Sequence, residues 1–162
     1  MISTQQTVPI ISIVIPLFNE QETFPKLYQR LTAIVDESYC WEFLFIDDGS
    51  QDNSWALIEQ TALIDKRVKG IRLTRNFGHQ IALAAGYQTA KGNAIISIDA
   101  DLQDPPELIP NLIAAWVEGF KIVYARRISR VDPWLKKIAA FSYYWLLHTM
   151  SDVFMPRNVG DF

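Results

Sequence analysis

The chain has 162 residues, a net charge of −3 and a single cysteine, Cys40. This length suits one domain with one hydrophobic core, and the negative charge argues against a general electrostatic grip on nucleic acid. One cysteine excludes an intrachain disulfide and fits a reducing compartment. No apolar run reaches the roughly 18 residues that span a bilayer, and the start, MISTQQTVPI, lacks the features of a signal peptide.

Short β-like runs alternate with helical patterns along the chain. Apolar, β-branched runs predict strands over residues 10–16, 41–47, 68–74, 94–99 and 121–125. Apolar residues at three- and four-residue spacing predict helices after Asn19, over 52–65, over 79–90, from Pro106 to Gly119, and from Pro133 to Met150. Asn19 is the expected cap of the first helix, with Glu22 completing a capping box. The small residues of 79–90 suit close packing.

This alternation predicts the fold class. Near-continuous apolar strands separated by helices indicate an α/β domain with a mostly parallel sheet covered on both faces. Ligands bind beyond the carboxyl ends of the strands in such sheets. Three predicted strands end in the polar sequences PLFNE, DDGS and DADLQ, so the sequence predicts a polar site along one edge of the sheet.

The sequence DADLQ places Asp99 and Asp101 directly after a buried strand. Two carboxylates that face one cavity repel each other unless a cation lies between them, and oxygen ligands favour Mg²⁺ or Mn²⁺. Gln103 can add a further oxygen. The alternative is that these are solvated loop acids in front of the helix that starts at Pro106.

Two further strand ends carry candidate binding residues. Asp47 follows the second strand and can reach a nucleobase or ribose, whereas Asp48 is interpreted as the more structural of the two. The residues Pro16, Leu17 and Phe18 can lie against a planar base, with Asn19 and Glu20 behind them. In both places the alternative is a turn that ends a strand and caps a helix.

The sequence RLTRNFGHQ offers Arg75, Asn76, Gly78 and His79 at a strand-to-helix turn. Backbone N–H groups at such a turn can face phosphates. The chain has neither the P-loop pattern nor G-x-G-x-x-G, which argues against a dinucleotide oxidoreductase. His79 is interpreted as a helix-end residue rather than a catalyst.

A basic segment follows the last predicted strand. Its members are Lys121, Arg126, Arg127, Arg130, Lys136 and Lys137. Arginine suits bidentate phosphate binding, so Arg126 or Arg127 can point into the same cavity; the alternative is a solvated loop. The aromatic residues of the Pro133–Met150 helix suit a membrane interface or ordinary packing.

Five motifs in order resemble the inverting GT-A glycosyltransferases of family 2. They are SIVIPLFNE, FIDDGSQDNS, LTRNFGHQIALAAGY, SIDADLQDPPE and NVGDF. The closer resemblance is to the polyprenyl-phosphate branch, which includes dolichyl-phosphate mannosyltransferases and bacterial bactoprenol glucosyltransferases. TRNFG, DADLQDP and NVGDF look most like the bactoprenol glucosyl type.

The resemblance implies roles for individual residues. Pro16, Leu17, Asn19, Glu20 and Asp47 would line the nucleoside pocket of a nucleotide-sugar site. Asp99, Asp101 and Gln103 would hold Mg²⁺ or Mn²⁺ on the donor diphosphate. Arg126, and less directly Lys136 or Lys137, would bind the acceptor phosphate. Asp161, in the G-D-F element, matches a residue often treated as the catalytic base.

The resemblance implies inverting transfer of a hexose, glucose from UDP-glucose, to undecaprenyl or dolichyl phosphate at the cytoplasmic face of the membrane. Residues 1–130 would form the GT-A domain, and 131–162 a basic, aromatic acceptor-side segment. Such a protein would continue into membrane helices and can form a homo-oligomer. One alternative is a family 2 enzyme with a saccharide acceptor. The other, a non-enzymatic receiver-like module, places its acids after different strands.

Overall fold

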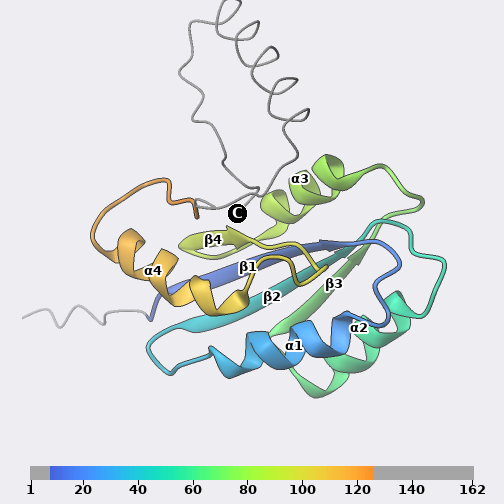
Figure 1. Ribbon diagram of the computed structural model, residues 1–162, viewed down its shortest axis with the longest axis horizontal. Helices are drawn as coiled ribbons and strands as arrows, with labels where there is room; N and C mark the ends of the chain where they lie inside the picture. Colours follow the sequence, from blue (N-terminus) through green and yellow to red (C-terminus); the bar gives the residue numbers. More distant parts are fainter. Residues whose placement is uncertain (1–7, 126–162) are drawn as a thin grey trace, which may run out of the picture. The chain divides into compact units, whose positions relative to one another are not determined.

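The structure, a computed structural model, describes residues 8–125 (Figure 1). Its strands are β1 (Ile10–Leu17), β2 (Cys40–Asp47), β3 (Val68–Arg72) and β4 (Ala94–Ser97). Its helices are α1 (Phe24–Ala33), α2 (Ser54–Ile64), α3 (His79–Thr89) and α4 (Ile109–Val117), with a short 3₁₀ helix, η1 (Pro106–Leu108), before α4. All strand pairs are parallel, in the order β3-β2-β1-β4, which confirms the predicted α/β class.

Helices cover both faces of the sheet (Figure 1). On one face, Ile11, Ile13 and Ile15 of β1 and the phenylalanines of β2 join one core cluster with α1, α2 and α4. On the other face, Val14, Leu44 and Ile46 pack against Ala82 and Leu83 of α3. Side chains alternate between the faces of a strand, so even-numbered residues of β1 and β2 face α3.

Close packing of α3 on the sheet depends on Gly86. A Cβ atom on this residue would lie 2.3 Å from Cγ1 of Val14 and 3.2 Å from Cγ1 of Ile46. These distances are well inside normal van der Waals contact, so any side chain would push α3 away from β1 and β2. The small-residue pattern of this helix therefore predicted its packing correctly.

The predicted cap of the first helix is wrong. The helix begins at Phe24, and its N-cap position is occupied by Thr23. Asn19 instead adopts a left-handed conformation with φ of 57°, and its side chain accepts a hydrogen bond from the backbone N–H of Gln51. A short polar side chain tolerates this conformation, and here its hydrogen bond is made to another loop rather than to the helix.

The predicted strand over residues 121–125 is also absent from the structure, which has bends and irregular backbone there. Ile122 is 84% exposed. The β-branched residues favour a strand only where a pleated, half-buried surface receives them, and 121–125 pair with no strand of the described region. Local composition alone therefore overestimated the sheet.

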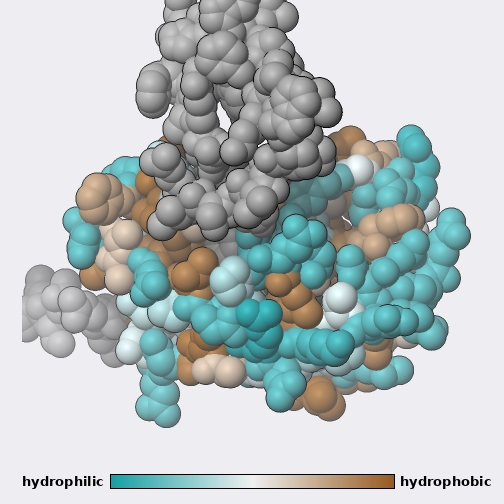
Figure 2. All heavy atoms as spheres, in the orientation of Figure 1, coloured by the Kyte–Doolittle hydropathy of each residue, from teal (hydrophilic) through white to brown (hydrophobic). Residues whose placement is uncertain are grey.

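Within residues 8–125 no helix is long and apolar enough to cross a membrane. Figure 2 shows hydrophilic and hydrophobic side chains interspersed over the visible face of this region. One compact unit extends to Val123, and Tyr124 and Ala125 belong to a second unit of which the structure describes only these two residues. The predicted boundary at residue 130 stays a prediction.

Candidate nucleotide-sugar site

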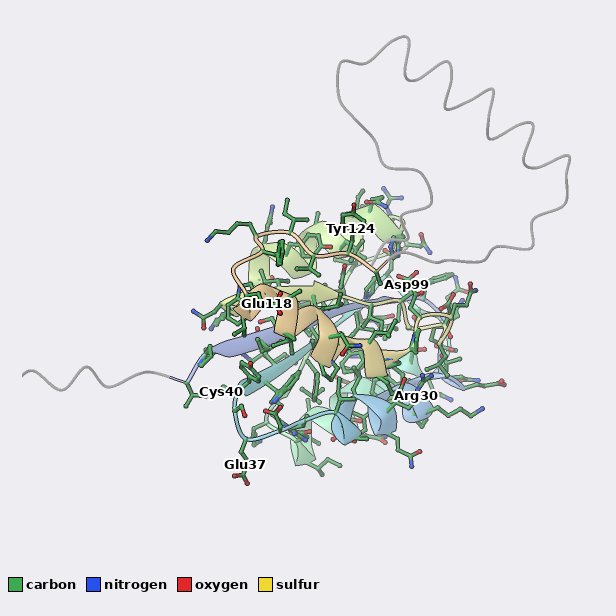
Figure 3. The ribbon with its side chains drawn as sticks, turned by 60° about the vertical axis from the view of Figure 1, so that its left-hand side comes forward. Arg30, Glu37, Cys40, Asp99, Glu118 and Tyr124 are labelled. Atoms are coloured by element: carbon green, nitrogen blue, oxygen red, sulfur yellow. The ribbon has the colours of Figure 1, made fainter. Side chains whose placement is uncertain are left out.

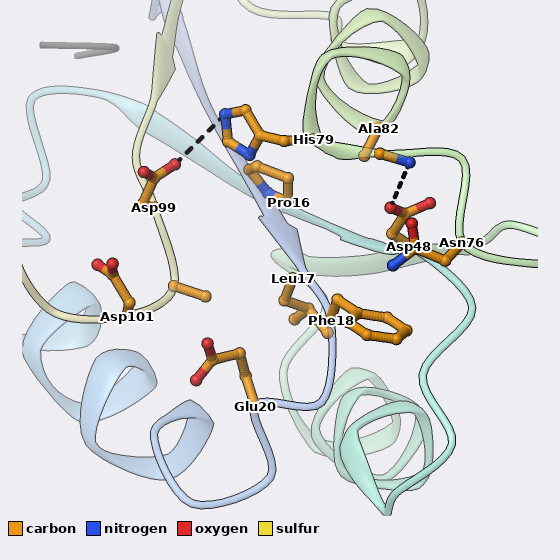
Figure 4. Close-up of a pocket in the computed structure, with 12 residues that line it drawn as sticks. Pro16, Leu17, Phe18, Glu20, Asp48, Asn76, His79, Ala82, Asp99 and Asp101 are labelled. Carbon is orange, nitrogen blue, oxygen red and sulfur yellow. Dashed lines mark hydrogen bonds and ion pairs between the residues drawn. The ribbon is translucent and has the colours of Figure 1, made fainter.

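A pocket of about 260 Å³ lies at the carboxyl ends of β1, β2 and β4 (Figure 4). Asp99, which lines it, and Cys40, at the start of β2, lie at opposite ends of the sheet (Figure 3). The lining residues are Pro16, Leu17, Phe18, Glu20, Asp48, Asn76, Gly78, His79, Ala82, Asp99, Ala100 and Asp101. The position is the one that the strand-end rule predicts for a ligand site in a parallel sheet.

The loops after β1 and β2 hold each other in place beside this pocket. Asn19 donates its backbone N–H to Oγ of Ser50 at 2.9 Å, and its side-chain oxygen accepts from the N–H of Gln51 at 2.8 Å. Glu20 donates its N–H to Oγ of Ser54 at 2.8 Å. Because these contacts run in both directions, the wall that carries Phe18 and Glu20 is fixed by the DGSQDNS sequence.

Asp48 fixes the neighbouring wall of the pocket. Its two carboxylate oxygens accept hydrogen bonds from the backbone N–H groups of Phe77 and Gly78, at 2.8 and 2.9 Å. Gly49 lets the same two loops approach, since a Cβ there would lie 2.5 Å from the backbone carbon of Arg75. Gly49 also has φ of 73°, which favours glycine. The turn after β2 therefore holds the loop before α3 in place.

Asp47, the residue expected to contact the nucleoside, lies elsewhere. It is completely buried and is not among the pocket-lining residues. One oxygen accepts the N–H of Ser50 at 3.0 Å, and the other lies 3.2 Å from Nε of Arg72. In this arrangement Asp47 shapes the turn after β2, while Asp48 reaches the pocket.

Asp99 and Asp101 both line the pocket, with Ala100 buried between them. Oδ1 of Asp101 accepts the backbone N–H of Gln103 at 2.9 Å, a local turn that aspartate favours. Leu102 between them has φ of 63°, which is costly for a residue with a Cβ. The chain thus turns sharply straight after the second carboxylate, and the side chain of Gln103 is exposed outside the lining set.

His79, the first residue of α3, lies across the pocket from the β4 loop. Its Nε2 is 3.6 Å from Oδ1 of Asp99, and Figure 4 shows the two groups pointing toward one another above Pro16. This nitrogen is buried and makes no hydrogen bond. The site therefore brings an imidazole and two carboxylates to the same cavity.

The donor set fits a divalent cation that is only partly held by protein. Within residues 8–125 no cluster of three or more histidine, cysteine, aspartate or glutamate side chains is arranged to hold a metal. Mg²⁺ is commonly bound by one or two carboxylates, with waters and substrate phosphates completing its shell. Asp99 and Asp101 meet that requirement, since both offer oxygen atoms to an open pocket.

Other predicted site residues are not brought to this pocket. Arg75 is exposed, and its guanidinium lies over the ring of Phe77 at 4.3 Å. Asn19 holds a neighbouring loop, as described above. Five predicted residues lie outside the described region: Arg126, Arg127, Lys136, Lys137 and Asp161.

Comparison with known proteins now decides the family. The model described as "Glycosyl transferase family 2" matches residues 12–158. The chain belongs to this family. The resemblance drawn from the five motifs is confirmed.

Three curated relatives of this family 2 chain illustrate its neighbours. An uncharacterized glycosyltransferase, YkcC, of Bacillus subtilis is 48% identical over 93% of this chain and 47% of its own length. A prophage bactoprenol glucosyl transferase homolog of Escherichia coli is 44% identical, over 94% and 50%. An undecaprenyl-phosphate 4-deoxy-4-formamido-L-arabinose transferase of Aeromonas hydrophila is 42% identical, over 82% and 41%. The chain thus spans about half the length of these relatives or less.

Solved structures share the fold of the family 2 chain. Glucosyl-3-phosphoglycerate synthase of Mycobacterium tuberculosis, solved with Mn²⁺, UDP and phosphoglyceric acid, matches with a TM-score of 0.64 and 21% identity, over 93% of this chain and 54% of that one. TarS of S. aureus, solved with UDP, matches with a TM-score of 0.56 and 19% identity, over 76% and 38%. At these identities the likeness establishes the fold alone, which is the predicted GT-A fold.

Proposed function

We propose that this family 2 protein transfers glucose from the nucleotide sugar UDP-glucose to a polyprenyl phosphate at the cytoplasmic face of the membrane. The observation that carries the proposal is the shared pocket of Asp99, Asp101 and the apolar surface at Pro16–Phe18. Two relatives whose names specify bactoprenol or undecaprenyl phosphate support the lipid acceptor.

The donor's nucleoside would lie against the loop after β1. Leu17 is buried, whereas Phe18 is 39% exposed, and both line the same pocket. An aromatic face suits the stacking of a base. Glu20 and Asp48 supply acceptor oxygens beside it, and these can bind N–H or hydroxyl groups of a uridine. Asp47 supports this surface from within the turn.

The donor's diphosphate would lie near Asp99 and Asp101. These two residues would hold Mg²⁺ or Mn²⁺, with Gln103 as the further ligand expected from the sequence. When bound, such an ion neutralises the diphosphate and makes it a better leaving group. The turn beside them is held by the Asp101 side chain, which accepts the backbone N–H of Gln103.

The acceptor is a phosphate monoester whose second pKa of about 6 leaves it largely ionised at neutral pH. It therefore needs little deprotonation before it attacks the anomeric carbon. Attack opposite the diphosphate inverts that centre and gives a β-linked product from UDP-glucose. Rate enhancement then comes mainly from positioning and electrostatic stabilisation. Arg126, Arg127 and Lys136 or Lys137 would bind the acceptor phosphate, and Asp161 would orient it.

The experiment is titration calorimetry of the chain with UDP, GDP and NAD, each with Mn²⁺ and with EDTA. We expect UDP to bind with Mn²⁺ and to bind much more weakly with EDTA. The Asp99→Asn/Asp101→Asn double variant should lose the Mn²⁺-dependent part while keeping the wild-type circular dichroism spectrum.

The matched control is Glu37→Gln, an exposed acid at the far end of the sheet from Asp99 (Figure 3). It should bind UDP as the wild type does. Equal binding by the double variant and the wild type would rule out the metal role of Asp99 and Asp101. Transfer is measured on the whole protein, with polyprenyl phosphate and with soluble saccharides as acceptors, and transfer to saccharides alone would refute the lipid acceptor.

A further inference from the structure

His79 stands out among the pocket residues because Nε2 of its imidazole makes no hydrogen bond. Nε2 is shielded from solvent and makes no hydrogen bond, although the side chain as a whole is 37% exposed. Its charged neighbour, Oδ1 of Asp99, is 3.6 Å away, which is beyond hydrogen-bond distance. A buried polar atom without a hydrogen-bond partner is unfavourable, and residues 8–125 place no acceptor within hydrogen-bond distance of this nitrogen.

The backbone around His79 cannot easily move to supply one. Asp48 holds the N–H groups of the two preceding residues, Phe77 and Gly78. On the inner side, Ala82 of α3 is buried against the sheet. The space beside Gly78 is open, since a Cβ there would meet no atom within 4 Å. The imidazole is thus attached to a backbone that hydrogen bonds hold in place, and it borders an open part of the pocket.

We propose that His79 donates a hydrogen bond from Nε2 to a phosphate oxygen of the nucleotide-sugar donor. The inference rests on the proposed function and deepens it. The same pocket holds the two carboxylates expected to carry the cation, and a diphosphate drawn to that cation brings acceptor oxygens to the side where Nε2 lies. A phosphate oxygen would also give Nε2 the hydrogen bond that it does not make to Asp99.

This role predicts a specific pattern of affinities. His79 would contribute to binding of the diphosphate and not of the nucleoside, because its imidazole faces Asp99 rather than Phe18 (Figure 4). The affinity for UDP should therefore depend on His79, and the affinity for uridine should not. A residue that only stabilised the pocket would affect both ligands equally.

The test is calorimetric titration of UDP and of uridine, both with Mn²⁺, into wild type, His79→Ala, His79→Gln and Gln80→Ala. His79→Ala should weaken UDP binding on the order of tenfold, the effect of one hydrogen bond to a charged group, and leave uridine binding unchanged. Glutamine places an amide N–H near the position of Nε2, so His79→Gln should recover most of the loss. Gln80→Ala is the matched control, an exposed neighbour on the same helix turn.

Three outcomes overturn the proposal. If the wild type binds UDP and His79→Ala binds it equally well, the role of His79 is refuted and the proposed function is not. Equal weakening of UDP and uridine assigns His79 a structural role. A wild-type protein that binds neither UDP nor GDP overturns the proposed function and this proposal together.

Discussion

Glu42 in β2 and Asp48 directly after it accept hydrogen bonds from backbone N–H groups at the two ends of α3. Asp48, directly after β2, accepts the N–H groups of Phe77 and Gly78 in front of the helix. Glu42, near the start of β2, accepts the N–H of Lys91 behind it, at 3.0 Å. Both residues are even-numbered, so both lie on the face of the sheet that α3 covers. The helix that carries His79 is therefore tied to one strand at both ends.

Replacing Asp48 tests the hydrogen bonds in front of α3. Asp48→Asn keeps one acceptor oxygen and should lose one of the two hydrogen bonds, which costs about 1–2 kcal/mol of unfolding free energy. Urea unfolding measures this loss. Amide exchange should accelerate at Phe77 and Gly78, while Ile13 in the centre of the sheet exchanges no faster than the loss of global stability requires. Unchanged exchange at Phe77 and Gly78 would contradict the tie.

The rear tie should show itself in the pH dependence of stability. Burial raises the pKa of Glu42, but hydrogen bonds from Lys69, Ser12 and the N–H of Lys91 outweigh it, so the pKa is lowered from 4.5. A lowered pKa means that this stabilisation is present above about pH 4.5 and is lost as the pH falls through the folded-state value.

Glu42→Gln measures this contribution. The difference in unfolding free energy between wild type and variant should be largest near pH 7 and shrink as the pH falls below 4.5. Arg67 and Arg30 hold the pKa of Asp65 and Glu107 at about 2, so these acids also titrate in this range, and each comparison is made at one pH. A difference that stays constant from pH 7 to pH 3 would refute the assignment.

Gly49 and Gly119 form a matched pair for testing the loop contact. Both have positive φ, of 73° and 103°, but only Gly49 has backbone atoms in the way of a Cβ. Gly119→Ala should cost about 1–2 kcal/mol through backbone strain alone. Gly49→Ala adds a clash with Arg75 and Asn76 and should cost clearly more. Equal melting temperatures for the two variants would show that the loops separate easily.

The ion pair of Arg30 and Glu107 joins α1 to η1, with Nε of Arg30 2.8 Å from Oε1 of Glu107. Their side chains are 34% and 55% exposed, so solvent screens the pair, and we expect a coupling energy of no more than about 1 kcal/mol. A double-mutant cycle with Arg30→Gln and Glu107→Gln, by urea unfolding at low and high salt, measures it. A larger coupling that persists in high salt would contradict this expectation.

Sequence periodicity located the strands, the helices and the edge of the sheet at which Asp99 and Asp101 lie. It favoured Asp47 over Asp48 as the residue that reaches the site, whereas Asp48 lines the pocket and Asp47 does not. Consecutive residues point to opposite faces, and which face carries the pocket depends on where α3 packs, which is a tertiary property. The signal for His79 and Asn76 was present in RNFGHQ, but only the packing of α3 against β1 brings His79 to Asp99, while Asn76 lies beside Asp48 (Figure 4). The 121–125 run failed because its β propensity has meaning only beside a partner strand.

The two ties of α3 make its number of residues a constraint in its own right. From Glu42 to Asp48 the chain advances about 20 Å along the sheet, and the 11 residues of α3 cover roughly 16 Å. Inserting or deleting one residue would rotate everything beyond it by about 100° and move it by about 1.5 Å. One carboxylate would then lose its N–H, and Gly86 would leave its place over Val14. Insertions should therefore be tolerated at the exposed residues 36–38 and not within this helix.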